Sequence, residues 1–203
     1  MFCTILSNDS QATARSAVYE KVFVSKPRMA LFICRREKMS ESFKGRVWIL
    51  GDDIDTDIII PTEYLAFKTV EEMAPYGFSP LRPELAGQIK EGDVIVAGSN
   101  FGCGSSREQA PEVVKALGIK AVIAGSFARI FFRNAINNGL LLIECPKLKD
   151  GVKEGDTIEV FPGDKIIANG VEYDIASLPD NLMEILNAGG LVKAMRKRNG
   201  LEA

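Results

Sequence analysis

From about residue 43 onward, short apolar runs alternate with longer segments whose apolar residues recur at helical spacing. Apolar runs bounded by glycine or charged residues predict buried strands at residues 46–50, 93–97, 121–124 and 140–143. Between the last three strands, the periodicity predicts helices at residues 106–117 and 127–138, ended by Gly118 and Gly139. Strands and helices alternating in this order predict an α/β fold with a parallel β-α-β core.

The stretch between the first two predicted strands interrupts this pattern. Three isoleucines at positions 58–60 form a short apolar run that ends at Pro61. Residues 62–90 are rich in loop-forming residues, with three further prolines and a weak helix predicted near residues 69–74. We therefore expect a loop-rich excursion here.

The C-terminal part of the chain changes character. Residues 156–160 alternate apolar and polar side chains with period two, and turn signals such as Asn169-Gly170 follow. These features predict a small antiparallel meander that extends to Ile175. Two helices are predicted after it, at residues 180–187 and 191–198, the last one basic.

Residues 1–40 show neither the helical nor the strand periodicity, and their apolar runs are short. Their arginines and serines would suit a transit peptide, but the acidic residues Asp9, Glu20 and Glu37 disfavour that interpretation. We expect translation to begin at Met39, so that residues 1–40 are a poorly ordered or non-native extension. Residues 41–203 are then a single domain.

The composition of the 203-residue chain, 46% hydrophobic and 26% charged, is that of an ordinary globular protein. A net charge of −2 gives no electrostatic reason to expect nucleic acid or an anionic membrane as a partner. No apolar run approaches the roughly 18 residues that a membrane span needs. We therefore expect no nucleic-acid partner and no membrane partner.

The absence of histidine narrows the chemistry further. It excludes Ser-His and Cys-His nucleophiles and histidine-based metal sites. The four cysteines, Cys3, Cys34, Cys103 and Cys145, form no CxxC pair and no pattern typical of secreted disulfide frameworks. We expect no metal bound by this chain, neither zinc nor an iron–sulfur cluster, and a reducing, cytoplasmic location.

The segment 98–108 is the strongest candidate for chemistry, because it leaves a buried strand and leads into a predicted helix. Its three glycines allow a tight turn and close approach to a ligand. The amino end of a helix favours anions, and Ser105, Ser106 and Arg107 add hydroxyl groups and a fork that binds carboxylate. The segment therefore predicts a site for an oxygen-rich anion.

Several alternatives compete with a carboxylate site. A dinucleotide fingerprint fails because Arg107 stands where G-x-G-x-x-G needs its third glycine, and the lysine of a P-loop is absent. Simple capping of the helix by Ser105 or Ser106 would not require three glycines and an arginine in one turn. Cys103 has no base partner, so we expect it to pack as a small residue rather than act as a nucleophile.

Three motifs in order resemble the aconitase superfamily, in particular the small subunits of the isopropylmalate and homoaconitate hydro-lyases. Residues 102–108 resemble the superfamily's serine-arginine loop, residues 51–61 resemble its D-x-D-T-D-x-I-x-P signature, and residues 125–135 resemble its S-F-A-x-I-F-x-x-N segment. The resemblance spans roughly residues 43–193. It implies the swivelling β/β/α domain of the aconitase type.

The resemblance also implies a division of labour between two chains. A separate large subunit would supply a [4Fe-4S] cluster, which acts as a Lewis acid on a small dicarboxylate substrate, in a heterodimer or heterotetramer. In this chain Ser105 would be the general base, with Arg107, Ser106 and Gly104 holding substrate carboxylate. Asp57 would orient the site. The helix terminus, nearby N–H groups and Arg107 would stabilise the serine alkoxide.

Two other interpretations of the aspartates at 52, 53, 55 and 57 are a solvated acidic turn and a calcium site. The glycine and terminal glutamate of a calcium-binding EF-hand loop are missing, which disfavours calcium.

The substrate preference depends on the segment Tyr64–Lys68, which in the resembling family faces the variable group of the substrate. Homoaconitases resemble Y-L-R-T here, whereas this chain has Ala66 and Phe67, an apolar pair that suits an isopropyl group. Lys68 is the nearest cation, and because it could pair with a further carboxylate, a more acidic substrate remains an alternative. Packing in the core is the alternative role for Phe67.

The resemblance thus implies isomerisation of 2- and 3-isopropylmalate by dehydration and rehydration, in leucine biosynthesis, by a subunit active only with its large partner. Citramalate, dimethylmalate or homoaconitate remain open as substrates, because an apolar pocket separates alkyl sizes only modestly. A non-catalytic carboxylate-binding module and a nucleotide-binding α/β domain are the alternatives outside that enzyme class.

Overall fold

The computed structural model describes residues 42–201, and the expectations for residues 1–40 lie outside this range. A single seven-stranded sheet organises the described chain, in the order β4-β3-β2-β1-β5-β6-β7. Its four parallel strands are β1 (Phe43–Ile49), β2 (Val94–Val96), β3 (Ala121–Ala124) and β4 (Leu141–Glu144). The predicted parallel core is confirmed.

The other half of the sheet is the predicted antiparallel meander, formed by β5 (Thr157–Phe161), β6 (Lys165–Ala168) and β7 (Val171–Asp174). Strand β1 joins the two halves. Its first residues, Phe43 to Arg46, pair with β5, and Val47 to Ile49 pair with β2. The antiparallel pairing with β5 explains why β1 begins three residues earlier than its apolar run predicts.

Two helices make the crossovers of the parallel half: α4 (Gln109–Ala116) between β2 and β3, and α5 (Arg129–Asn137) between β3 and β4. The glycines that end them, Gly118 and Gly139, have the positive φ angles of 93° and 75°. The remaining helical elements are α1 (Thr56–Ile59), η1 (Thr62–Ala66), α2 (Val70–Met73), η2 (Ala74–Tyr76), α3 (Leu85–Gln88), α6 (Leu148–Gly151), α7 (Asp180–Asn187) and α8 (Leu191–Arg198).

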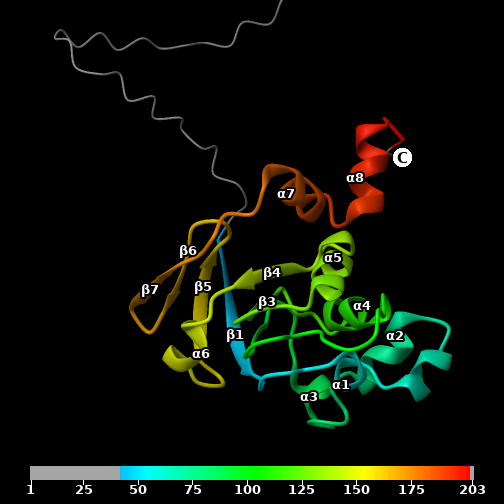
Figure 1. The fold of residues 1–203 in the computed structure, drawn as a ribbon, viewed down its shortest axis with the longest axis horizontal. Coiled ribbons are helices and arrows are strands. Elements are labelled where there is room, and N and C mark those ends of the chain that lie inside the picture. The colour runs from blue at the N-terminus through cyan, green and yellow to red at the C-terminus, as the bar shows by residue number, and fades with distance from the viewer. Residues whose placement is uncertain (1–41, 202–203) are drawn as a thin grey trace, which may run out of the picture. The chain divides into compact units, whose positions relative to one another are not determined.

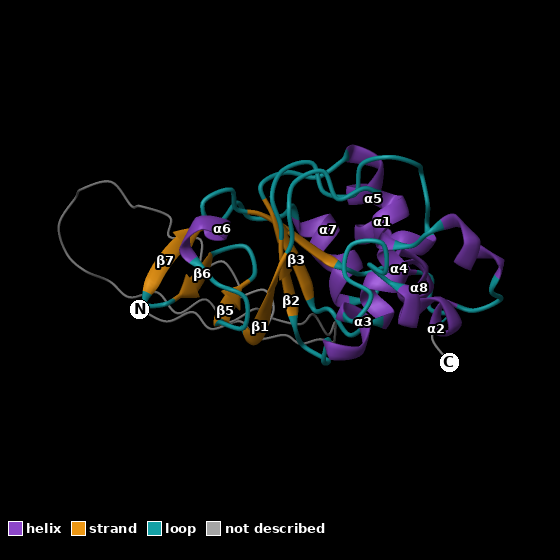
Figure 2. Ribbon diagram, turned by 90° about the horizontal axis from the view of Figure 1, so that it is seen from below, coloured by secondary structure: helices purple, strands orange, loops and turns teal. Residues whose placement is uncertain are grey.

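Each face of the sheet is covered by its own apolar cluster, because alternate residues of a strand point to opposite faces. Trp48, Ile95 and Val122 pack with the helices on one face, whereas Val47 and Ile123 pack with β5, β6 and α6 on the other. Helices α1 to α5 and α8 gather on one side of β1–β3, and α6 lies on the other side, beside β6 and β7 (Figures 1 and 2).

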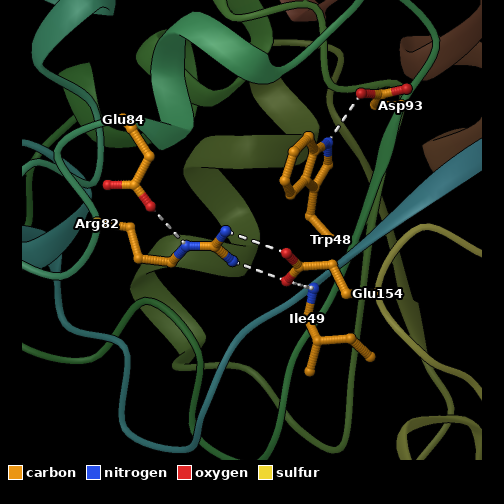
Figure 3. A network of polar contacts seen from close by, with 6 residues as sticks. All are labelled: Trp48, Ile49, Arg82, Glu84, Asp93 and Glu154. Atoms are coloured by element: carbon orange, nitrogen blue, oxygen red, sulfur yellow. Dashed lines mark hydrogen bonds and ion pairs between the residues drawn. The ribbon is translucent and has the colours of Figure 1, made fainter.

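The excursion between β1 and β2 is fastened to the sheet by a polar network (Figure 3). Arg82 donates to both carboxylate oxygens of Glu154, at 2.7 and 3.0 Å. Its guanidinium lies 5.6 Å from the Trp48 ring centre, and Arg46 lies 4.5 Å from the same ring. The buried Asp93 accepts the Trp48 indole N–H at 2.8 Å. Through Glu154, which also accepts the Ile49 N–H at 3.3 Å, Arg82 connects the excursion to strand β1.

Besides the earlier start of β1, two further segments around the serine-arginine loop differ from the sequence-based prediction. The run of isoleucines forms the end of helix α1, because the Asp55 carboxylate caps it by accepting the Ile58 N–H at 2.7 Å. Helix α4 begins at Gln109 rather than Ser106. Within residues 42–201, no helix is long and apolar enough to cross a membrane.

Candidate active site

The three sequence motifs meet at one edge of the sheet. They follow β1, β2 and β3, and the carboxyl ends of parallel strands lie at the same edge. The loop after β2 lies between the other two and bridges Asp55 on one side and Phe127 on the other. The joining backbone hydrogen bonds run from Gly102 to Ile54 (2.7 Å), Thr56 to Cys103 (2.9 Å), Phe101 to Ser126 (3.0 Å) and Ala128 to Phe101 (2.9 Å).

The serine-arginine loop does not pass directly into helix α4. The residue at the N-cap of α4 is Glu108, in helical conformation and without a capping side chain. Ser105 and Ser106 are exposed and lie outside the helix. Capping by either serine is therefore wrong as an explanation.

Thr56 holds the backbone of Ser105 from both sides. Its hydroxyl accepts the Ser105 N–H at 3.1 Å and donates to the Ser105 carbonyl at 3.2 Å. The Arg107 N–H also donates to that carbonyl, at 2.9 Å. The N–H groups of Ser105 and Arg107 are therefore both occupied by contacts that fix the loop.

The Arg107 side chain is mostly buried and points toward α1. It donates to the Ile60 carbonyl and the Thr62 hydroxyl, each at 2.8 Å, and forms an ion pair with Asp57 at 2.5 Å. Thr62 in turn donates to Asp57 at 3.0 Å. These three acceptors leave at most two of the five guanidinium N–H donors for a ligand. The arginine is thus oriented before any ligand arrives.

Asp57 is the counterion of this arrangement. The hydrogen bond from Arg107 is the main reason that its pKa lies below the usual value for aspartate, and the bond from Thr62 adds to this. Asp57 is therefore ionised at neutral pH. The contact supports the orienting role expected for Asp57.

Glycines allow the loop its close packing. Gly102 has φ of +77°, and a Cβ atom at this position would overlap the Phe131 ring. Gly104 has φ of +91°, and a Cβ atom would lie 3.2 Å from the Thr56 hydroxyl. Gly104 is exposed and lies next to the Thr56 hydroxyl that holds Ser105. It therefore shapes the loop, and it is also a candidate contact for the ligand.

Cys103 shows no feature of a nucleophile. The pKa of its thiol is raised, mainly by partial burial and to a lesser extent by the negative charges of Asp55 and Asp53. The thiol is therefore protonated at neutral pH. Cys145 is buried, and its pKa is raised by burial as well.

The other aspartates of the first motif each have a structural partner, so the motif is not simply a solvated acidic turn. Asp52 accepts the Ser99 N–H at 2.8 Å and pairs with Lys149. Asp53 accepts the Asn100 side-chain amide at 2.8 Å. Within residues 42–201, no three histidine, cysteine, aspartate or glutamate side chains are placed to hold a metal ion.

The substrate-preference residues lie on η1 and just after it. Ala66, Phe67 and Lys68 are exposed, so packing of Phe67 inside the core is wrong. The Phe67 ring stacks on Tyr64 and Tyr76 instead. Element η1 begins at Thr62, the residue that Arg107 contacts, which connects this segment to the serine-arginine loop.

Two functional neighbours carried no signal of their own in the sequence, Thr56 and Thr62. Each contributes one hydroxyl to a group 45 or more residues away in the chain. The only sequence signal for them is their position, since Thr56 lies within the motif at residues 51–61 and Thr62 follows it directly. The site can bind a carboxylate at Arg107 and presents two serine hydroxyls to solvent.

Comparisons of the sequence and of the structure with known proteins point to the same group of proteins. Residues 82–148 match the family model of the aconitase C-terminal domain. A 3-isopropylmalate dehydratase small subunit from Lachnospira eligens is 77% identical over 164 residues, covering 81% of this chain and 100% of the relative. An isopropylmalate/citramalate isomerase small subunit from Methanocaldococcus jannaschii is 48% identical over 163 residues, covering 79% and 97%. The crystal structure of 3-isopropylmalate dehydratase (LeuD) from M. jannaschii has a TM-score of 0.75 at 45% identity, covering 79% and 97%.

Proposed function

Because this chain belongs to the family of 3-isopropylmalate dehydratase small subunits, within the aconitase superfamily, we propose that it serves as such a subunit. It would interconvert 2- and 3-isopropylmalate in leucine biosynthesis, together with a large subunit, which the family name implies. A cytoplasmic location is part of this proposal.

One observation carries the proposal: an exposed serine loop lies beside an arginine that is already oriented. Arg107 is fixed by Ile60, Thr62 and Asp57, and the backbone of Ser105 is fixed by Thr56. A carboxylate bound at the guanidinium donors that these contacts leave free, at most two, would place a substrate beside the two exposed serines. These groups would form one part of an active site, and a second chain would supply the rest.

The chemistry that this chain supplies is proton transfer and anion binding. Ser105 would remove the proton next to a substrate carboxylate, and Arg107 with Ser106 and Gly104 would hold that carboxylate as charge develops. A [4Fe-4S] cluster on the large subunit would add Lewis-acid chemistry at the substrate hydroxyl. The described residues fit a place opposite such a cluster better than a place among its ligands, since they offer hydroxyl groups and a cation.

Citramalate is the second candidate substrate, because the name of the M. jannaschii relative includes it. The exposed apolar surface at Ala66 and Phe67 accommodates either a methyl or an isopropyl group. Homocitrate carries a distal carboxylate, and the segment Tyr64–Lys68 offers only Lys68 as a cation to pair with it. Because the rest of that segment is apolar or aromatic, we expect homocitrate to be the poorest substrate.

The test is anaerobic reconstitution with the large subunit from the same genome. Turnover of isopropylmalate and citramalate by the complex, with none by either chain alone, is expected. A preference for homocitrate would overturn the substrate assignment. Carboxylate binding by this chain alone, with no turnover in the complex, would favour a non-catalytic module, and saturable nucleotide binding would favour a nucleotide-binding domain.

A further inference from the structure

Three aromatic rings form one surface on the excursion between β1 and β2. The Tyr76 ring lies 4.1 Å from Tyr64 and 5.6 Å from Phe67, while Tyr64 and Phe67 are 6.2 Å apart. All three planes agree within 15°. These distances form a triangle, so Tyr76 contacts both of the other rings at once.

Tyr76 is attached to a rigid part of the molecule. The next residue, Gly77, packs so closely on α4 that a Cβ atom would lie 2.9 Å from the Leu117 side chain. Phe78 follows, fully buried, and its N–H donates to the Ile59 carbonyl of α1 at 3.0 Å. The position of Tyr76 is therefore set by α1 and α4.

Phe67 is attached through its backbone to η1, where its N–H donates to the Tyr64 carbonyl at 3.2 Å, and it is about as exposed as Tyr76, which is 37% exposed. It is 38% exposed and lies between exposed neighbours, Ala66 and Lys68. Its aromatic partners in the described chain are Tyr64 and Tyr76. Since Tyr76 lies on η2 and its ring contacts both other rings, removing it would leave the Phe67 ring with Tyr64 as its one aromatic partner among the described residues.

The same helix α1 connects this surface to Arg107. Ile60 is the C-cap residue of α1, and its carbonyl accepts from Arg107. The hydroxyl of Thr62, two residues before Tyr64, accepts from Arg107 as well. An anion-binding group and an exposed aromatic surface are thus joined through a few residues of fixed backbone. A carboxylate with a small branched alkyl group suits that combination, because its two ends need a cation and an apolar surface.

We propose that Tyr76 is a positioning residue that sets the preference for the alkyl group of the substrate by holding the Phe67 ring in place. This inference rests on the proposed function above. It goes beyond the segment Tyr64–Lys68, because Tyr76 lies outside that segment and would act only through the ring of Phe67.

The experiment uses the reconstituted complex and measures kcat and KM for isopropylmalate and citramalate. Tyr76→Ala is expected to lower the ratio of kcat/KM for isopropylmalate over citramalate roughly tenfold, mainly through the KM of isopropylmalate. Tyr76→Phe retains the ring and should keep the wild-type ratio. Leu81→Ala, which truncates another exposed residue of the excursion that is 44% exposed, is the matched control and should also keep it.

Tyr76→Leu keeps an apolar side chain without a flat ring and serves as the second variant if the alanine variant does not assemble. It should lower the ratio in the same direction. An unchanged ratio in either assembled variant, or an equal loss for both substrates, would overturn the proposal for Tyr76. A wild-type complex that does not turn over isopropylmalate would instead overturn the proposed function.

Discussion

The hydroxyl of Thr56 satisfies both backbone groups of Ser105, accepting the N–H at 3.1 Å and donating to the carbonyl at 3.2 Å. Thr56 is 1% exposed, so no solvent replaces it. One buried side chain from the preceding motif therefore holds the backbone of the loop at Ser105 itself. This contact, more than the helix that follows, fixes the loop.

Thr56→Val should test that role, because it keeps the shape and removes the hydroxyl. We expect a loss of about 1–3 kcal/mol in the free energy of unfolding, since the Ser105 N–H loses its partner. We also expect a lower kcat in the reconstituted complex. Thr56→Ser keeps the hydroxyl and should recover most of both. Wild-type kcat in the valine variant would contradict the positioning role.

Ser105→Ala should lower kcat by about 10²- to 10⁴-fold, the usual contribution of a general base. The residue is exposed, so the melting temperature of the subunit should stay near the wild-type value. Ser106→Ala is the matched neighbour and should act mainly through a higher KM. Full turnover by the Ser105→Ala complex would remove Ser105 from the role of base.

Arg107→Lys should lower kcat/KM even though it keeps the charge. A lysine ammonium cannot reach the Ile60 carbonyl, Thr62 and Asp57 together with a substrate carboxylate. Loss of one hydrogen bond to a charged group costs about 1.5–3 kcal/mol, or roughly 10- to 100-fold. Steady-state kinetics on the complex measures this. Equal activity of the lysine variant would show that charge alone suffices.

Gly102→Ala should destabilise the subunit by about 1–3 kcal/mol or more, because it combines a positive φ with overlap of the Phe131 ring. Gly51→Ala is a matched control in the neighbouring loop, where a Cβ atom would have no neighbour within 4 Å. Denaturant unfolding of both variants gives the comparison. Equal midpoints would mean that the Gly102 turn is not required.

The stability of the subunit should fall in acid partly through Asp93. Burial alone would raise the pKa of its carboxyl, but hydrogen bonds from Arg46, the Lys90 N–H and Trp48 together bring it below the ordinary value. Because the folded pKa is the lower one, the stabilisation is complete above the ordinary value, near pH 4. It is lost as the pH falls from there through the folded pKa.

Asp93→Asn tests this link. It should cost about 1–3 kcal/mol at neutral pH, since Arg46 loses its charged partner. Below about pH 4 its stability should depend less on pH than that of the wild type. The free energy of unfolding, measured at several pH values, gives both results. Parallel pH profiles of the two proteins would contradict the assignment to Asp93.

Much of the fold could be predicted from the sequence because strands and helices depend on local periodicity. The bounds of α7 and α8 agree with those predicted, and the four parallel strands and the meander lie where their apolar runs indicate. The pairing of β1 with β5 could not be predicted, because the two strands are more than a hundred residues apart.

The sequence by itself determined that this chain lacks a histidine or a CxxC pair and that its serine-arginine loop follows a buried strand. It also determined that each of the three motifs follows an apolar run predicted to be a strand. These conclusions needed only residue types, their order and local spacing.

Only the tertiary structure decided which polar groups of the loop remain free. Thr56 occupies the backbone of Ser105 across 49 positions, and Arg107 finds the Ile60 carbonyl across 47. The structure also shows that α4 begins only at Gln109 and that Tyr76 lies against Phe67 and Tyr64. Such contacts depend on the packing of distant segments, which leaves no periodic signal in the chain.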